Sequence, residues 1–196
     1  MTQALRIVVA DDEPDVRDYY RKILPRLGHC VVAAAATGLE LIALCRQHRP
    51  DLVVTDIKMP VLDGIDAAVK IYEEMPIPVI LVSAYSDAKL IERAEADHIM
   101  SYLVKPIKQA DLEPAIALAM RRFEQFEALR RETSDMRQAL EDRKLIERAK
   151  GILMRELNLN EPEAFRRLQK TASAKNLKLI EVARLAIGTA KELSKP

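Results

Sequence analysis

The sequence predicts an α/β fold, with a doubly wound, five-stranded parallel sheet followed by a long helix and a small three-helix all-α domain. Three observations predict it. Five short apolar runs alternate with amphipathic stretches in the first half of the chain. These runs are rich in Val and Ile and mostly unbroken by polar residues, as in strands buried on both faces. From residue 109 to residue 150 there is no glycine and only one proline, which favours a long helix.

The five expected strands are residues 5–10, 30–34, 52–55, 79–82 and 102–104. One apolar helical stripe lies between the first two strands and consists of Val16, Tyr20, Ile23, Leu24 and Leu27. Thr37 followed three residues later by Glu40 predicts a capping box at the start of the second helix. Asp63-Gly64 predicts a turn before the third helix.

Composition and charge limit the classes of function. The chain has 196 residues, of which 49% are hydrophobic, enough for one large domain or two small ones. Its net charge is +1, but residues 1–108 carry 13 basic and 16 acidic side chains (net −3) and residues 109–196 carry 18 and 14 (net +4). This uneven distribution indicates two different partners.

Two cysteines and the absence of a long apolar run bear on the compartment. Cys30 and Cys45 lie in apolar surroundings without metal-ligand spacing, and we expect both to be buried free thiols in a reducing cytosol. No signal peptide precedes Leu5, and no apolar run approaches the ~18 residues of a membrane span. The sequence therefore predicts a soluble, cytoplasmic protein.

Polar side chains follow four of the five expected strands. These residues are Asp11, Asp12 and Glu13 after the first, Asp56 after the third, Ser83 after the fourth, and Lys105-Pro106 after the fifth. Because ligands of such sheets bind beyond the carboxyl ends of the strands, we expect these side chains to converge. Clustered carboxylates repel one another, and Mg²⁺, which prefers oxygen ligands, relieves that repulsion.

The same residue types fit phosphoryl transfer. An aspartate can attack a phosphoryl group and form an acyl phosphate, while Mg²⁺ and Lys105 neutralise charge and Ser83 donates a hydrogen bond. Simpler interpretations exist for each residue taken alone. Asp11 or Asp12 could only cap the first helix, Asp56 could only begin a loop, and Lys105 could be an ordinary solvated lysine. Three consecutive acids exceed what a cap needs, so the sequence favours a phosphorylation site.

Four stretches in order resemble the receiver domain of response regulators, which has a flavodoxin-like fold. They are residues 8–14 (VVADDEP), 54–60 (VTDIKMP) with Asp63-Gly64, 81–84 (LVSA) and 102–106 (YLVKP). The resemblance covers residues 5–120, and we expect a receiver domain over residues 1–120. It implies that a sensor histidine kinase phosphorylates Asp56. It also implies a cis peptide bond at Lys105-Pro106, which a proline permits.

The resemblance also implies the remaining site roles. Asp12, Asp56 and the main-chain carbonyl of Lys58 would hold Mg²⁺, with Asp11 assisting through water. Ser83 and Tyr102 would form the switch pair, and Lys105 would bind the phosphate. The protein would not be an enzyme beyond its own phosphotransfer from the kinase and its autodephosphorylation. Phosphorylation would change the face formed by the fourth helix and fifth strand.

Residues 109–142 are predicted to form a helical linker. Its apolar residues recur at three- and four-residue steps: Phe126, Leu129, Thr133, Met136 and Leu140. Because the flanks of this seam are charged, we expect a coiled helix that forms a homodimer on activation. The alternative is a helix that packs on its own domain.

Residues 139–196 are expected to form the three-helix domain, and they carry 13 basic and 8 acidic side chains (net +5). Asn158 is expected to end the first helix, Asn160 with Glu163 to cap the second, and Asn176 to end it. Candidate phosphate contacts are Arg148, Lys150, Arg155, Arg166, Arg167, Lys170, Lys175 and Lys178. The alternative is an ordinary solvated surface, and charge alone does not separate RNA from DNA.

Residues 149–154 (AKGILM), residues 163–168 (EAFRRL), Ala172, Asn176 and Val182-Ala183 resemble the ANTAR domain, a family of RNA-binding transcription antiterminators. The resemblance implies binding to RNA hairpins in leader transcripts, with Lys150, Gly151, Arg166 and Arg167 in the matching blocks. We therefore expect a phosphorylation-controlled antiterminator. The alternatives are a DNA-binding response regulator and a protein-interaction relay. An enzymatic output is disfavoured, because the tail has no histidine or cysteine.

Overall fold

The structure, a computed structural model, describes residues 4–84 and 99–193, and over these residues it confirms the predicted fold class. The strands are β1 (Arg6–Ala10), β2 (Cys30–Ala35), β3 (Leu52–Asp56), β4 (Val79–Ser83) and β5 (Ile99–Val104). The helices are α1 (Pro14–Arg26), α2 (Gly38–His48), α3 (Gly64–Glu74), α5 (Gln109–Leu157), α6 (Glu161–Lys175) and α7 (Leu179–Leu193). The fourth helix that the resemblance implies would fall in residues 85–98, outside the described residues.

The sheet has the strand order β2-β1-β3-β4-β5, and every neighbouring pair is parallel. The carboxyl ends of all five strands therefore lie at the same edge of the sheet. Asp56 and Ser83 are the last residues of β3 and β4, while Asp11 and Lys105 directly follow β1 and β5. This topology places the predicted site residues at one edge.

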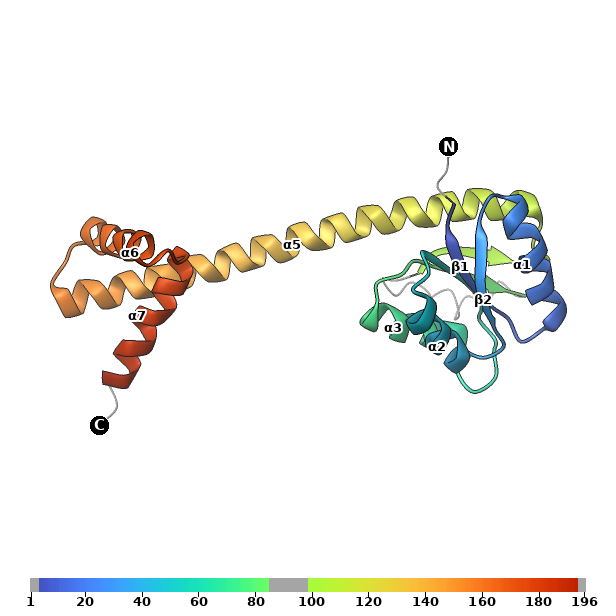
Figure 1. Ribbon diagram of the computed structural model, residues 1–196, viewed down its shortest axis with the longest axis horizontal. Helices are drawn as coiled ribbons and strands as arrows, with labels where there is room; N and C mark the ends of the chain where they lie inside the picture. The colour runs from blue at the N-terminus through green and yellow to red at the C-terminus, as the bar shows by residue number, and fades with distance from the viewer. Residues whose placement is uncertain (1–3, 85–98, 194–196) are drawn as a thin grey trace. The chain divides into compact units, whose positions relative to one another are not determined.

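Helices cover both faces of the sheet, as Figure 1 shows, and an apolar layer lies between the sheet and the helices on each face. Ile7 and Val9 of β1 pack with Tyr20 of α1 and Leu112 of α5 on one face. On the other face, Val8 packs with residues of α2 and α3. Successive strand residues point to opposite faces, so the unbroken apolar run of β1 supplies both layers.

Local sequence signals set the starts of α2 and α3, although only half of the capping box predicted for α2 is formed. Thr37 Oγ1 accepts a hydrogen bond from the Glu40 amide (3.2 Å), although the Glu40 carboxylate accepts from the amide of Ala36 rather than from that of Thr37. Asp63 caps α3 by accepting from the Asp66 amide (2.8 Å). These contacts satisfy amides that a first helical turn leaves without intrahelical partners.

Two details of the predicted sheet are wrong. The fifth strand begins at Ile99 rather than at Tyr102, because Met100 and the residues around it extend the pairing with β4. Cys30 is exposed, whereas Cys45 is buried as expected. The apolar residues around Cys30 indicated a core position, but β2 is an edge strand and Cys30 is its first residue.

The chain divides into two compact units, residues 1–127 and 128–196. In the second unit the C-terminal part of α5 packs with α6 and α7 around Ala149, Leu168, Val182 and Ala183. The first of the three expected helices is thus not separate, because α5 is a single helix of 49 residues. The physical reason is that no glycine or proline interrupts residues 115–150.

Three asparagines define the ends of α5 and α6, as predicted. Asn158 and Asn176 have φ values of 50° and 52°, the left-handed conformation that closes helices. Asn160 and Glu163 form a reciprocal capping box, in which each side chain accepts a hydrogen bond from the other's amide at 3.0 and 2.9 Å.

The predicted seam on α5 separates into two parts. Phe126 packs with the first unit's core and meets the Tyr72 ring edge-on at a centroid distance of 6.3 Å. Phe126 therefore contributes to the packing of the first unit, and its place in a dimer seam stays a prediction. Leu129, Met136 and Leu140 are 65%, 60% and 55% exposed. Across the described residues, no helix combines the length and apolar character needed to cross a membrane.

Candidate functional site

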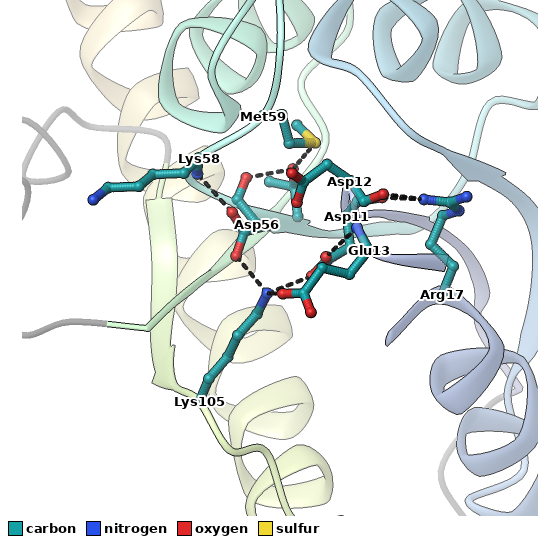
Figure 2. Close-up of polar contacts among 9 residues, drawn as sticks. Asp11, Asp12, Glu13, Arg17, Asp56, Lys58, Met59 and Lys105 are labelled. Atoms are coloured by element: carbon teal, nitrogen blue, oxygen red, sulfur yellow. Dashed lines mark hydrogen bonds and ion pairs between the residues drawn. The ribbon is translucent and has the colours of Figure 1, made fainter. Parts of the chain in front are cut away.

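The side chain of Lys105 lies at the centre of the predicted acidic site (Figure 2). Its Nζ is 2.9 Å from Asp11 Oδ2, 2.9 Å from Asp56 Oδ1 and 3.3 Å from Glu13 Oε1. These groups come from the ends of β1, β3 and β5, so the parallel topology brings together residues up to 94 positions apart. One ammonium thus faces three carboxylates and leaves an excess of negative charge.

Asp56 is buried and its carboxylate is held on both oxygens. Oδ1 pairs with Lys105, and Oδ2 accepts a hydrogen bond of 2.6 Å from the Lys58 amide. Burial raises the pKa of Asp56, and the charge of Asp11 adds to this, while the Lys105 and Lys58 contacts oppose it; the net pKa is above the ordinary value. Burial therefore leaves the Asp56 carboxylate poorly solvated.

The same contacts keep Lys105 charged. Burial alone would lower the pKa of its ammonium, but the contacts with Asp11 and Asp56 outweigh burial and raise it. A protonated lysine beside an acceptor carboxylate is suited to neutralising the oxygens of an incoming phosphoryl group.

Asp11 is fully buried, whereas Asp12 and Glu13 are exposed. Asp11 Oδ1 accepts a hydrogen bond from the Glu13 amide (3.0 Å). Arg17 of α1 binds the backbone of this acidic loop. Its Nη1 donates to the carbonyl oxygens of Asp11 (2.6 Å) and Asp12 (2.9 Å). This loop presents potential ligand atoms of Asp11, Asp12 and Glu13 within 4.8 Å of one another.

The donor set fits a hard divalent cation. Asp11 Oδ2 is a buried oxygen that accepts no hydrogen bond of good geometry, although Lys105 Nζ pairs with it electrostatically. A buried oxygen in that position, with exposed carboxylates beside it, is the kind of group that Mg²⁺ ligation satisfies. The residues present therefore fit Mg²⁺.

Sequence reasoning missed three residues that shape the site. Arg17 was detectable in principle, because a cation near a helix start opposes the helix dipole and calls for a local partner. Thr55 is buried and its hydroxyl donates to the Asp56 carbonyl oxygen (3.0 Å). At Gly64 an added Cβ would lie 2.0 Å from that same oxygen, so only glycine allows α3 to begin this close to β3.

Ser83 and Tyr102 lie on the neighbouring strands β4 and β5. Tyr102 pairs in register with Leu81, two residues before Ser83, so both side chains belong to the same face of the sheet. Ser83 is buried at the carboxyl edge, and Tyr102 is half-buried. The two predicted switch residues are therefore placed on one face.

The basic residues proposed for the second unit fall into two groups. Those with exposed side chains are Arg148, Arg155, Arg166, Arg167, Lys170, Lys175 and Lys178. Lys150 is buried and pairs with Glu147 and Glu161. At Gly151 an added Cβ would meet no atom within 4 Å. Close helix packing within the described residues therefore does not explain why this position is a glycine.

Comparison with known proteins gives a family for this arrangement. Residues 7–117 match the response regulator receiver domain, and residues 134–185 match the ANTAR domain. The chain belongs to the response regulators. It is a two-component response regulator with an ANTAR output domain, a combination typical of regulators that are not enzymes.

Relatives of this response regulator include the transcriptional regulatory protein PdtaR of Mycobacterium tuberculosis, which is 40% identical over 184 residues, covering 94% of this chain and 90% of PdtaR. Transcriptional regulatory protein HptR of Staphylococcus aureus is 32% identical over 118 residues, covering 59% of this chain and 46% of HptR. The receiver domain protein of Clostridium thermocellum superposes with a TM-score of 0.57 at 30% identity, covering 62% of this chain and 98% of that one.

Proposed function

We propose that Asp56 accepts a phosphoryl group from a sensor histidine kinase, and that this modification controls RNA binding by the ANTAR domain. The observation that carries the proposal is the Asp56 carboxylate, buried beside Asp11 and in contact with the Lys105 ammonium. A carboxylate oxygen of Asp56 attacks phosphorus, the bond from phosphorus to the kinase's imidazole nitrogen breaks, and the nitrogen keeps the electron pair. The product is an acyl phosphate.

Mg²⁺ is the cofactor that we propose for this site. Asp11, Asp12, Asp56 and the main-chain carbonyl of Lys58 would hold it, and Glu13 is a further carboxylate within reach of the Asp11 and Asp12 oxygens. When bound, Mg²⁺ supplies charge neutralisation for the phosphoryl oxygens. Lys105 neutralises from its own side, held in place by Asp11 and Glu13.

The proposed switch uses Ser83 and Tyr102. A phosphoryl group on Asp56 adds ~1.5–2 negative charges and new acceptor oxygens. The Ser83 hydroxyl then donates to one of these oxygens, and Tyr102 moves into the space that Ser83 leaves. Their placement on one face of neighbouring strands supports this coupling.

The proposed output is transcription antitermination through RNA hairpins in leader transcripts. The match to the ANTAR family and the exposed cations between residues 139 and 189 support an RNA partner. We place the receiver at residues 1–120, the helical linker at 109–142 and the ANTAR domain at 139–196. We further propose that Leu129, Met136 and Leu140 form the seam of a homodimer on activation, because large apolar side chains at these steps are exposed.

The decisive experiment combines phosphorylation with RNA binding. Wild-type protein, incubated with Mg²⁺ and acetyl phosphate, should gain the mass of one phosphoryl group and bind a two-hairpin RNA at least several-fold more tightly. Asp56→Asn should do neither, whereas Asp51→Asn, a carboxylate outside the site, should behave as wild type. An identical response of Asp56→Asn and wild type would refute the acceptor. Preference for duplex DNA over the hairpin RNA would refute the RNA output.

A further inference from the structure

Lys150 occupies an unusual position in the ANTAR domain. Within the described part of residues 128–196, it is the only charged side chain that is buried, with 9% of its side chain exposed. It lies on α5 next to Ala149, a buried residue of the three-helix core. Charged groups are buried only when they are paired, so the partners of Lys150 define its role.

Two carboxylates and an aromatic ring surround the Lys150 ammonium. Its Nζ is 2.6 Å from Glu161 Oε1 and 2.9 Å from Glu147. The centroid of the Phe165 ring lies 5.8 Å away, within the range of a cation–π contact. The hydrogen bonds that Lys150 donates, first to Glu161 and then to Glu147, raise the pKa of Lys150, so it stays protonated at neutral pH.

These contacts join α5 to the start of α6. Glu161 is the first residue of α6 and follows its cap, Asn160, while Phe165 lies one turn further along. Lys150 and Glu147 belong to α5. In addition to the apolar core, the Lys150 ammonium therefore ties the first turn of α6 to α5. The exposed cations Arg166, Arg167 and Lys170 follow directly on α6.

The electrostatics disfavour Lys150 as a contact for an RNA phosphate. Glu147 and Glu161 remain 54% and 65% exposed, so an approaching phosphate would meet two carboxylates before it reached the amine. Lys150 would also have to give up both ion pairs. The exposed arginines of α6 present no such barrier.

We propose that Lys150 is a positioning residue, which holds the first turn of α6 against α5 through Glu161 and Phe165 so that the exposed cations of α6 meet the RNA. This proposal rests on the RNA binding proposed above. It replaces the direct phosphate contact that the charge distribution of residues 139–196 suggested for Lys150.

Salt dependence separates a positioning residue from a contact. Each phosphate contact contributes about 0.7–0.9 to the slope of log K against log salt, so its loss lowers the slope by nearly one. Binding of a fluorescent two-hairpin RNA would be titrated over a series of salt concentrations, at a temperature where circular dichroism shows every variant folded. Lys150→Met should bind about tenfold more weakly at every salt concentration, with an unchanged slope. Arg166→Gln, the contact control, should lose close to one unit of slope.

Glu161 gives the sharper test. Removing an acidic side chain from an RNA-binding surface should tighten binding if only charge matters, and Glu156→Gln, an exposed carboxylate on α5, should do so or have no effect. Glu161→Gln should instead weaken binding several-fold, and the double variant with Lys150→Met should be no weaker than Lys150→Met alone. A reduced slope for Lys150→Met together with tighter binding by Glu161→Gln would overturn the proposal.

A second readout does not depend on RNA. Thermal unfolding of the same four proteins (wild type, both single variants and the double variant) should show a non-additive double-mutant cycle between Lys150 and Glu161. If wild type failed to bind the RNA while this coupling was present, the proposed function would fail but the contact from Lys150 to α6 would stand. Additive effects in the cycle would overturn the positioning role.

Discussion

Single residues of the receiver show how burial and charge act against each other. Asp56 has its pKa raised first by desolvation, while Lys105 and the Lys58 amide stabilise its charged form. Because the folded state binds this proton more tightly than the unfolded state, the stability linked to Asp56 is fully present below the unfolded pKa of about 3.9. It is lost as the pH rises through the raised folded pKa. At neutral pH the ionised, buried carboxylate of Asp56 therefore lowers the free energy of unfolding.

Asp56→Asn should accordingly gain stability over wild type as the pH rises from roughly 4 to 7, because asparagine has no proton to lose. Urea unfolding of both proteins in Mg²⁺-free buffer across this range measures the difference. Asp51→Asn serves as the control for a carboxylate outside the site. A difference that stayed constant with pH would show that ionisation of Asp56 does not cost stability.

Val61 is a second residue that lowers the stability of the receiver, in this case through its backbone conformation. It has a φ of +70° and is 82% exposed, in the loop between Asp56 and α3. A left-handed conformation costs an L-residue about 1–2 kcal/mol, and β-branched residues are least suited to it. Since most of the Val61 side chain is exposed, its packing offsets little of this cost.

Val61→Asn should therefore stabilise the receiver by about 1 kcal/mol, because asparagine tolerates the left-handed region. Chemical denaturation followed by circular dichroism would measure the gain. Val61→Ile keeps the β-branch and should give no gain. Equal stability of the asparagine variant and wild type would indicate that the loop relaxes the strain elsewhere.

At the scale of elements, α5 runs through both units as one helix, and Gly151 is the only glycine within it. A glycine within a helix costs about 1 kcal/mol relative to alanine, and nothing lies within 4 Å of the place where its Cβ would be. Gly188 in α7 has the same open surroundings. The two glycines therefore form a matched pair, of which only Gly151 lies in the block proposed to contact RNA.

Gly151→Ala and Gly188→Ala should each raise the free energy of unfolding by up to about 1 kcal/mol, because alanine restricts the unfolded chain and favours the helix. Only Gly151→Ala should also weaken RNA binding, since a methyl group there would block close approach of the RNA. Thermal unfolding and RNA titration of both variants test this. Unchanged RNA binding by Gly151→Ala would remove Gly151 from the interface.

At the scale of the whole molecule, we propose that phosphorylation at Asp56 and self-association along α5 together couple the receiver to the ANTAR domain. Three large apolar side chains are exposed along α5 and would form the proposed surface for a second copy of the chain: Leu129, Met136 and Leu140. Phosphorylation at Asp56 is expected to shift the equilibrium toward that dimer.

Leu140→Lys should lower self-association of the phosphorylated protein at least tenfold, because it places like charges across the seam. Sedimentation velocity with Mg²⁺ and acetyl phosphate measures this. Leu39→Lys, on an exposed leucine of the receiver that is 52% accessible, is the matched control and should associate as wild type. Association that survived Leu140→Lys would place the dimer contact elsewhere.

The sequence by itself determined the features that depend on short stretches of chain. The β–α alternation, the meeting of Asp11, Asp56 and Lys105 at one edge, and the capping box at Asn160 all followed from periodicity and local hydrogen bonding. The site's acidic and basic residues were predictable because parallel topology requires the strand ends to meet.

Only the tertiary structure decided which side chains are buried and what they pair with. Phe126 packs on Tyr72, 54 residues earlier, Cys30 is exposed because β2 is an edge strand, and Lys150 is enclosed by Glu161 and Phe165 of the next helix. A sequence pattern indicates which residues of one helix or strand are apolar and which are charged. Burial and ion pairing depend on the neighbouring elements, whose positions are set by the packing of distant segments.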